Sequence, residues 1–441
     1  MDIIKLINHS SVLIKEEDCF ILTDPWFEKP AFGSWLPVPP TSVHPSYLVA
    51  LSKTVDNFCI LISHGHDDHL DDDLLSLFPK DTTIILPKYR SKGTYFRVKN
   101  IGFTNILEVP REGASWKHFE IKSFINSDIS GDDAILTISG KTKFIVHAND
   151  NWQSLTQPDL ATIKQDALKH LEENRVYMSQ CNLADGWPNI YKDYDDKQKK
   201  EIHSTRVERM IVSGLNNAQN VGILKFLNYA GYAACFIKGK EYLREVTSYQ
   251  SSQVVAELAK SIGSKVEVLD MLPGDHYDFN QIHNQFQDII LGEKQIKESS
   301  YEFYDKYKRV LNCNSYRKNN LLTNVQLKSG LDNFLNQFKQ FVEERVQKYN
   351  FNPDIVDYRI SFVAPNAHST VEMSTATKKS CTFHVSNSVA SSLLTGEINW
   401  EHLYVGYDSE ISTSPKNTNI RAVIRWLSMY GYKFQRESQN V

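Results

Sequence analysis

The sequence lacks several features that would assign it to common protein classes. No apolar run approaches the ~20 residues of a membrane-spanning helix, so we expect no membrane segment. Its beginning has no basic segment followed by a long apolar core, and we therefore expect no signal peptide. Lys and Arg number 49 against 53 Asp and Glu, a net charge of −4. Nucleic-acid binders usually carry a basic face, so we expect no nucleic-acid partner.

Cysteine pairs are also missing. The six cysteines are scattered and form no CxxC or CxH pair. This distribution argues against a zinc ribbon, a Rieske cluster and a disulfide framework. We interpret the cysteines as reduced, mostly buried thiols of a cytoplasmic protein. The glycines have no phosphate-loop spacing, and no Ser-His-Asp or Cys-His nucleophile can be identified.

The length of 441 residues indicates two domains. Residues 3–24 alternate as a hairpin, and residues 28–50 form a long loop rich in proline and aromatics. The pattern predicts strands at 58–62, 83–87, 104–109, 118–124, 133–138, 143–147, 176–178, 233–236 and 266–269. It predicts helices at 70–77, 157–173, 197–212 and 250–262. Two strand-rich halves with helices between them favour an α/β fold of the αββα sandwich type.

The chain becomes charged and polar between about 285 and 320. We place a boundary there, with a metal-binding catalytic domain at 1–290 and a smaller C-terminal α+β domain at 291–441. The second domain has predicted strands at 357–364, 369–375 and 380–385, and predicted helices at 325–349, 387–394 and 418–430. It contains no metal motif, so we expect it to bind substrate or close the pocket.

A histidine cluster follows the apolar run at 58–62 directly. His64 and His66 are spaced so that both can converge on one ion, because Gly65 permits a tight bend. Asp68 and His69 come one short turn later and can face a second ion. Nitrogen and carboxylate donors of this kind suit zinc, iron or manganese. The sequence therefore predicts a binuclear metal site.

The remaining ligands must come from distant segments. Asp150 follows the strand at 143–147, a suitable position for a carboxylate that bridges two ions, although it could also cap a helix. His276 lies in a loop after another strand and is the predicted last ligand. It could instead contact only the substrate, and Asp275 is then the alternative donor.

The strings NHSSVLI from Asn8, ILTDPW from Ile21 and the histidine cluster resemble the metallo-β-lactamase superfamily over residues 1–285. Within it, the segment from Asp24 to Trp35 resembles the catalytic region of CMP-N-acetylneuraminate hydroxylases. Shorter strings at 184–188, 230–236 and 399–407 extend this likeness toward the C-terminus. The resemblance implies an αββα fold, two metal ions, and a sugar-nucleotide or acylamino substrate.

One departure from the hydrolases of the superfamily concerns a ligand. Those enzymes usually place a histidine after the strand that precedes the bridging aspartate, whereas this chain has Asp128 there, with Asp132 or Asp133 as substitutes. The first site would then be His64, His66, Asp128 and Asp150, and the second would be Asp68, His69, Asp150 and His276. Anionic oxygen ligands favour iron over zinc, because they stabilise oxidised iron.

Two functions therefore compete. The favoured one is a non-haem di-iron oxygenase that hydroxylates a small polar metabolite. The hydroxylases that the sequence resembles carry a Rieske domain, whose Cys and His pairs this sequence lacks, so a separate ferredoxin or reductase must then supply electrons. The alternative is a zinc or manganese hydrolase of a phosphodiester, ester or amide, in which Asp68 or Asp150 orients the nucleophile.

Other residues receive supporting roles. Asp24 is expected to anchor the loop near the metals by hydrogen bonding, and His9 to line the pocket or lie in the core. His147 is expected to pack in the sheet, and His368 and His384 to be ordinary residues of the C-terminal domain. The predicted substrate contacts are Trp26, Trp35, Asp185, Trp187 and Tyr191, where the aromatic residues, with Phe32, could equally cover a core edge.

Overall fold

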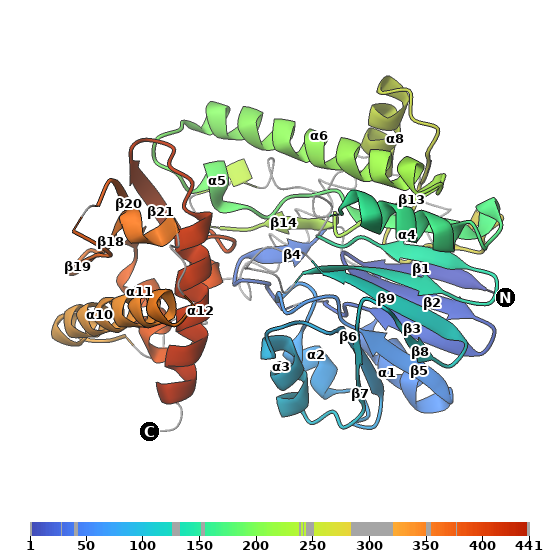
Figure 1. Ribbon diagram of the computed structural model, residues 1–441, viewed down its shortest axis with the longest axis horizontal. Coiled ribbons are helices and arrows are strands. Elements are labelled where there is room, and N and C mark those ends of the chain that lie inside the picture. Colours follow the sequence, from blue (N-terminus) through green and yellow to red (C-terminus); the bar gives the residue numbers. More distant parts are fainter. Residues whose placement is uncertain are drawn as a thin grey trace.

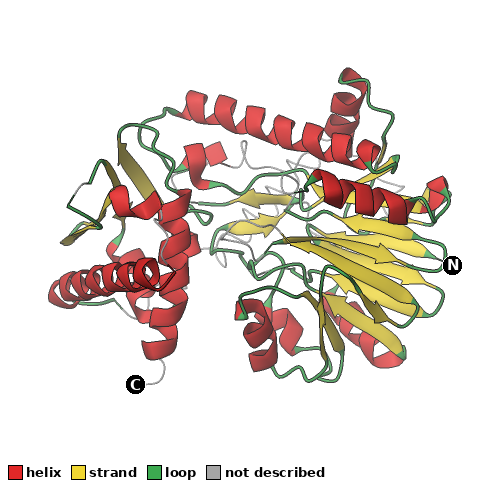
Figure 2. Cartoon of the chain, in the orientation of Figure 1, coloured by secondary structure: helices red, strands yellow, loops and turns green. Residues whose placement is uncertain are grey.

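The computed structural model describes residues 2–27, 29–38, 43–125, 133–150, 155–237, 240, 242–243, 251–283, 321–349, 354–375 and 377–438. Two sheets stack face to face, with helices on both outer faces, and a C-terminal region carries a sheet of its own (Figures 1 and 2). The predicted αββα sandwich with a smaller C-terminal α/β part is confirmed.

The first sheet has the strand order β17-β16-β1-β2-β3-β5-β6-β7. Its strands are β1 (Ile3–Asn8), β2 (Ser11–Glu16), β3 (Cys19–Thr23), β5 (Asn57–Leu61), β6 (Thr83–Pro87), β7 (Ile106–Val109), β16 (His276–Tyr277) and β17 (Ile282–His283). The predicted hairpin is β2–β3, whose strands pair antiparallel. Strands β3, β5, β6 and β7 are parallel, so their carboxyl ends share one edge of the sheet.

The second sheet has the order β15-β13-β12-β11-β10-β9-β8. Its strands are β8 (Ala114–Trp116), β9 (Phe119–Ile125), β10 (Ala134–Ser139), β11 (Phe144–His147), β12 (Arg175–Gln180), β13 (Lys225–Tyr229) and β15 (Glu267–Leu269). Strands β11, β12, β13 and β15 are parallel. Strand β11 is fully buried. A strand covered on both faces needs a nearly continuous apolar run, which Phe144, Ile145 and Val146 provide.

Apolar side chains from both sheets fill the space between them, including Leu6, Val12 and Met178. The first sheet is covered on its outer face by α1 (Pro45–Thr54), α2 (Asp72–Ser76) and α3 (Gly93–Ile101). The second is covered by α4 (Gln157–Ala167), α6 (Asp196–Asn220) and α8 (Ser252–Ser261), with the 3₁₀ turn η1 (Glu172–Asn174) leading into β12. No helix among the described residues is long and apolar enough to cross a membrane.

The C-terminal region has a mixed sheet of order β19-β18-β20-β21. Its elements are α10 (Asn324–Tyr349), η2 (Asp354–Asp357), β18 (Tyr358–Ala364), β19 (Ala367–Glu372), β20 (Lys379–Val385), α11 (Asn387–Thr395), η3 (Trp400–Leu403), β21 (Ser409–Ser414) and α12 (Arg421–Ser438). In α10, Leu327, Leu331 and Phe334 recur at helical spacing and are buried, as in an amphipathic helix. Their apolar cluster continues into the first part of the chain through Phe32 and Tyr191.

The connection between the two parts also contains α5 (Gly186–Asn189) and a small antiparallel pair, β4 (Trp35–Pro37) with β14 (Ala233–Cys235). The predicted loop at 28–50 was therefore wrong in part, since β4 and α1 lie within it. Strands β13 and β21 and helix α3 were not predicted. The expected boundary between 285 and 320 lies outside the described residues.

Candidate metal centre

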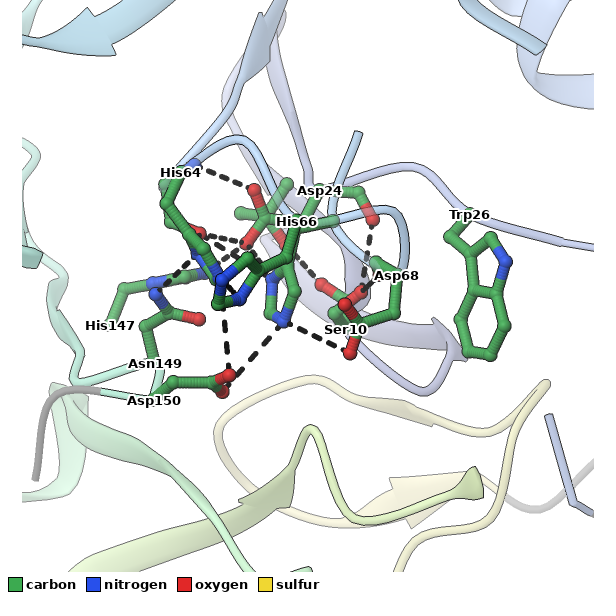
Figure 3. Close-up of polar contacts among 12 residues, drawn as sticks. Ser10, Asp24, Trp26, His64, His66, Asp68, His147, Asn149 and Asp150 are labelled. Carbon is green, nitrogen blue, oxygen red and sulfur yellow. Dashed lines mark hydrogen bonds and ion pairs between the residues drawn. The ribbon is translucent and has the colours of Figure 1, made fainter. Parts of the chain in front are cut away.

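The histidine cluster lies at the edge where the parallel strands of both sheets end. Its residues occupy the loop between β5 and α2. His9 comes from the turn between β1 and β2, and Asp150 follows β11. Figure 3 shows that Asp150 points toward His64 and His66 of this loop, and His9 lies 3.4 Å from Asp68 of the same loop. Carboxyl ends of parallel strands are the usual place for a site in an open α/β sheet.

The first group of donors consists of His64, His66 and Asp150, which each offer an atom within 4.8 Å of the others. His64 Nε2 lies 2.7 Å from His66 Nδ1, and 3.9 Å from Asp150 Oδ2. The Nδ1 atom of His64 lies 3.0 Å from the hydroxyl of Ser63, which fixes the ring. Two imidazole nitrogens and a carboxylate so arranged can chelate a single cation.

The second group consists of His9, Asp68 and His69. Asp68 Oδ2 lies 3.4 Å from His9 Nε2 and 3.6 Å from His69 Nε2. The other oxygen of Asp150, Oδ1, lies 3.7 Å from His69 Nε2. Asp150 thus faces both groups, one oxygen toward each, which is the arrangement expected of a bridging carboxylate.

Asp24 lies beneath the second donor group and contacts Ser63, His69 and Tyr229. It is fully buried at the end of β3, and its carboxylate accepts hydrogen bonds from the backbone N–H and the hydroxyl of Ser63 at 2.6 and 2.7 Å. Tyr229 donates to it at 2.7 Å, and His69 Nδ1 lies 3.0 Å away. Burial raises the pKa of Asp24, but His69 and His147 outweigh it and hold the pKa well below its usual range. A charged Asp24 fixes the tautomer of His69 and turns its Nε2 outward.

The donor atoms fit metal ions. Among the described residues, His69 Nε2, Asp68 Oδ1 and Asp150 Oδ1 are buried without a hydrogen-bond partner. Such atoms are costly to bury unless a ligand satisfies them. Burial lowers the pKa of His69, but Asp68, Asp150 and Asp24 raise it to about 10. A bound cation would compensate these carboxylates and take the place of the proton on His69 Nε2.

A further carboxylate lies beside the first group. Asn149 donates to Asp133 at 2.9 Å, and its amide lies 3.0 Å from His64 Nδ1. Burial and the charge of Asp150 raise the pKa of Asp133 to about 7. Asp133 was one of the two predicted substitutes for Asp128. Asp128 and Asp132 both lie outside the described residues, so their part in the site stays a prediction.

The structure does not bring His276 to either group. In β16 it pairs with Lys5, and its ring stacks on that of His283 with centroids 4.6 Å apart. Asp275, the alternative donor, accepts from the backbone of Leu272 at 2.9 Å. The register explains this, because Lys5 is four residues before His9, about 13 Å along an extended strand. His9 stands in the second group, where the sequence led us to expect His276.

Three predicted substrate contacts, Trp26, Trp35 and Tyr191, are buried in the structure, and their contact with a substrate stays a prediction. Trp26 is fully buried, its ring edge-on to His9 with centroids 5.2 Å apart. Trp35 donates from Nε1 to the carbonyl of Val405 at 2.7 Å, and Tyr191 donates to Thr418 at 3.2 Å. Their side chains therefore join the sandwich to the C-terminal region. Sequence patterns could not separate this role from a pocket wall, because both use aromatics in a loop.

Asp185 and Trp187 lie in the same junction. Asp185 caps α5 by accepting a hydrogen bond from the N–H of Trp187. It also forms ion pairs with Arg206 and Arg421, which compensate its negative charge. Trp187 is half-buried under Arg206, whose guanidinium carbon lies 4.9 Å from the ring centroid. A substrate contact by Trp187 stays a prediction.

Three further histidines, His147, His368 and His384, lie outside the two donor groups. His147 is buried at the end of β11, with Nε2 3.5 Å from Asp24. In the C-terminal sheet, His368 contacts Thr370 at 3.1 Å and His384 contacts Ser412 at 3.0 Å. Neither of the last two belongs to a described donor group.

Sequence reasoning missed the residues that join the metal loop to the C-terminal region. Asp67 lies between two candidate ligands, and His402 Nε2 is 3.6 Å from its Oδ2. Glu401, on the same turn η3, is the carboxylate that raises the pKa of His66 most, against the lowering effect of burial. The string NWEHLYVGY from Asn399 was noticed only as a family likeness, because no local signal connects it to a loop more than 300 residues earlier.

Comparison with known proteins agrees with this architecture. Residues 3–180 match the family model described as the β-lactamase superfamily domain. The chain therefore carries a metallo-β-lactamase superfamily domain. It is 22% identical over 332 residues to a cytidine monophosphate-N-acetylneuraminic acid hydroxylase of Asterias rubens, covering 69% of this chain and 46% of that protein. It is 30% identical over 103 residues to a protein of Mycolicibacterium smegmatis named as a Rieske 2Fe-2S iron-sulfur protein, covering 23% and 19%. The chain spans less than half the length of either relative.

Solved structures with a similar course of the chain include enzymes of two kinds. CmlA, a diiron β-hydroxylase from Streptomyces venezuelae, is 14% identical with a TM-score of 0.41, covering 64% of this chain and 54% of that chain. An isothiocyanate hydrolase from Delia radicum gut bacteria is 16% identical with a TM-score of 0.37, covering 62% and 98%. Likenesses of this size give no support to either activity for this chain.

Proposed function

We propose that the protein is a binuclear metal-dependent oxygenase that hydroxylates a small polar metabolite of the sugar-nucleotide or acylamino type. The observation that carries the proposal is the position of Asp150 between the two donor groups, with Asp133 as an additional carboxylate beside it. Anionic oxygen donors favour iron. The name of the Asterias relative supports the substrate class.

The first ion would be held by His64, His66 and Asp150, with Asp133 or the predicted Asp128 completing the set. The second would be held by His9, Asp68 and His69, with Asp150 shared. Bound iron would supply the capacity to reduce dioxygen and oxidise a C–H bond. The chain itself orients the donors, since Asp24 fixes the ring of His69 and Ser63 fixes that of His64.

An oxygenase of this kind consumes electrons from outside the site. We therefore propose a separate electron donor, a ferredoxin or a reductase, as its partner. Support comes from the name of the Mycolicibacterium relative, an iron-sulfur protein of which this chain covers 19%.

A hydrolase is the second candidate. One observation favours it: each described donor group contains two imidazoles, the nitrogen donors that zinc commonly takes in hydrolytic sites. Asp68 or Asp150 would then orient the attacking water toward a phosphodiester, ester or amide.

Metal analysis separates the two candidates. The protein is purified without added metal ions, and its metal content and absorption spectrum are measured, with the variant Asp150→Ala as the site control. We expect close to two irons per chain and oxygen consumption when a chemical reductant and an acylamino sugar are supplied. Stoichiometric zinc, with cleavage of bis(p-nitrophenyl) phosphate that Asp150→Ala abolishes, would overturn the oxygenase and establish the hydrolase.

A further inference from the structure

The turn η3 of the C-terminal region meets the metal loop at His402. His402 Nε2 lies 3.6 Å from Asp67 Oδ2, and neither side chain is more than about a quarter exposed, at 11% and 26%. The same oxygen of Asp67 accepts from the backbone N–H of Phe32 at 3.4 Å. Asp67 stands between His66 and Asp68 in the chain, so the contacts that hold its side chain also restrain the backbone beside two candidate ligands.

On its other side, Asp67 meets Arg97 of α3. Arg97 Nη2 lies 3.3 Å from Asp67 Oδ1 and donates to the carbonyl of Leu70 at 3.0 Å. Its Nη1 donates to the carbonyl of Gly65 at 2.7 Å, and its Nε donates to Asp72 at 2.8 Å. One guanidinium therefore fixes the loop backbone between the two histidines of the first group and again after His69. A planar donor fork is well suited to this, because little freedom remains once it is bound.

The turn η3 cannot easily follow a displaced Asp67. Ser34 donates from its hydroxyl to the carbonyl of Gly406 at 2.8 Å, and Trp35 Nε1 donates to Val405 at 2.7 Å. A side chain at Gly406 would approach the carbonyl of Phe32 to 2.5 Å, which shows how closely the segment after η3 is seated. Burial raises the pKa of Asp67, but His402 and Arg97 outweigh it and keep the carboxylate charged.

We propose that His402, Asp67 and Arg97 form a line of positioning residues through which the C-terminal region sets the geometry of the first metal position. None of the three belongs to a described donor group. They act on His64 and His66 through the backbone of Gly65 and Asp67. The inference rests on the metal binding that the proposed function includes, and it holds for an oxygenase and a hydrolase alike.

Metal titration of full-length variants tests this inference. The variants are His402→Ala, Asp67→Asn and their combination, with His368→Ala as a control from the same region. Affinity for Zn²⁺ is measured by chelator competition, and the absorption bands of the Co²⁺-loaded protein report ligand geometry. Removing partners that orient metal ligands typically lowers affinity about 10- to 100-fold. We expect a loss of that order for one of two ions, with altered Co²⁺ bands, and no change in His368→Ala.

The double variant tests whether His402 acts through Asp67, because the losses of metal affinity are then not additive in free energy. If His402 acts through Asp67, the double variant loses no more affinity than the single variant with the larger loss. His402→Gln, which keeps a donor at the same place, should recover part of the loss and covers the case that His402→Ala does not fold. Two results would overturn the inference and leave the proposed function intact. In the first, every variant binds two ions as tightly as wild type does. In the second, the fold-loss of affinity in the double variant is the product of the losses in the single variants. A wild type that binds neither ion would overturn both.

Discussion

Asp24 lies 3.0 Å from Nδ1 of His69, and this one contact decides which ring nitrogen of His69 faces Asp68 and Asp150. The neighbouring donors, Tyr229 and Ser63, keep the carboxylate of Asp24 in place and charged. A buried residue that binds no metal itself thereby determines whether the second donor group is complete.

Replacing Asp24 by Asn should weaken metal binding strongly. The amide has nearly the same shape, but its NH₂ group would face donors, and the ring of His69 would lose its partner. We expect affinity for one ion to fall about 10- to 100-fold, measured by chelator competition. Asp18→Asn, on the exposed turn between β2 and β3, is the matched control and should bind as wild type does. Equal affinity of Asp24→Asn and wild type would contradict the role given to this residue.

Asp150 and His66 should differ in the number of ions they affect. Because Asp150 faces both donor groups, Asp150→Ala should lower the affinity for both ions. His66 belongs to the first group only, so His66→Ala should leave one ion bound with nearly native affinity. Isothermal titration with Zn²⁺ gives the stoichiometry of each variant. If Asp150→Ala still binds one ion as tightly as wild type does, the bridging position is refuted.

Glu401 should influence the protonation of His66 in the metal-free protein. Burial lowers the pKa of His66, but Glu401, Asp68 and Asp150 raise it above the ordinary value. Removing the negative charge in Glu401→Gln must therefore lower the pKa of His66, which NMR titration of the histidine ring protons measures. Glu410→Gln is the control: it should lower the pKa of His384, on which Glu410 has a raising effect, and leave that of His66 unchanged.

Glu16 should make stability depend on acid pH. Its carboxylate is 1% exposed and accepts hydrogen bonds from the backbone N–H groups of Lys141, Thr142 and Lys143 at 2.9, 2.9 and 3.1 Å. Burial raises the pKa of Glu16, but these donors outweigh it and lower the pKa below 4.5. A carboxyl whose pKa is lower in the folded state stabilises the fold above its unfolded pKa, and that stabilisation is lost as the pH falls through the folded value.

Glu16→Gln should therefore lower the thermal midpoint of the chelator-treated protein at pH 7, by the equivalent of about 2 kcal/mol. The difference from wild type should shrink as the pH falls below 4.5. Glu17→Gln, next in the chain and exposed, should change little at either pH. A Glu16→Gln deficit that is the same at pH 7 and pH 4 would show that charge is not the cause.

The local parts of this structure were open to prediction from the sequence. An apolar strand ending at a histidine cluster has a short-range pattern, and β5, the loop after it and α2 follow that pattern closely. Strand β13 does not, because Lys225 and Asn228 interrupt its apolar run, and pairing with β12 and β15 on either side makes it a strand. Tertiary contacts outweighed the local preference there.

Ligand selection from distant segments was less accessible. His9 and His276 both stand beside apolar strands, and nothing in their neighbours separates them. The difference is the register of β1, which puts the turn after Asn8 at the metal loop and Lys5 opposite His276. Likewise, the sequence does not reveal that Trp35 and Tyr191 donate hydrogen bonds to Val405 and Thr418 of the C-terminal region.

The apolar cluster that unites Phe32 and Trp35 with the C-terminal helices has a consequence for engineering and for the exchange of parts among relatives. A graft that transfers only the segment after 321 would separate Trp35 from Val405 and Asn189 from Tyr407. The transferable unit therefore includes residues 29–37 with β4, and α5, two pieces of the front half of the chain. Chimaeras cut at a single point between the two regions should lose these contacts, whereas three-piece chimaeras keep them.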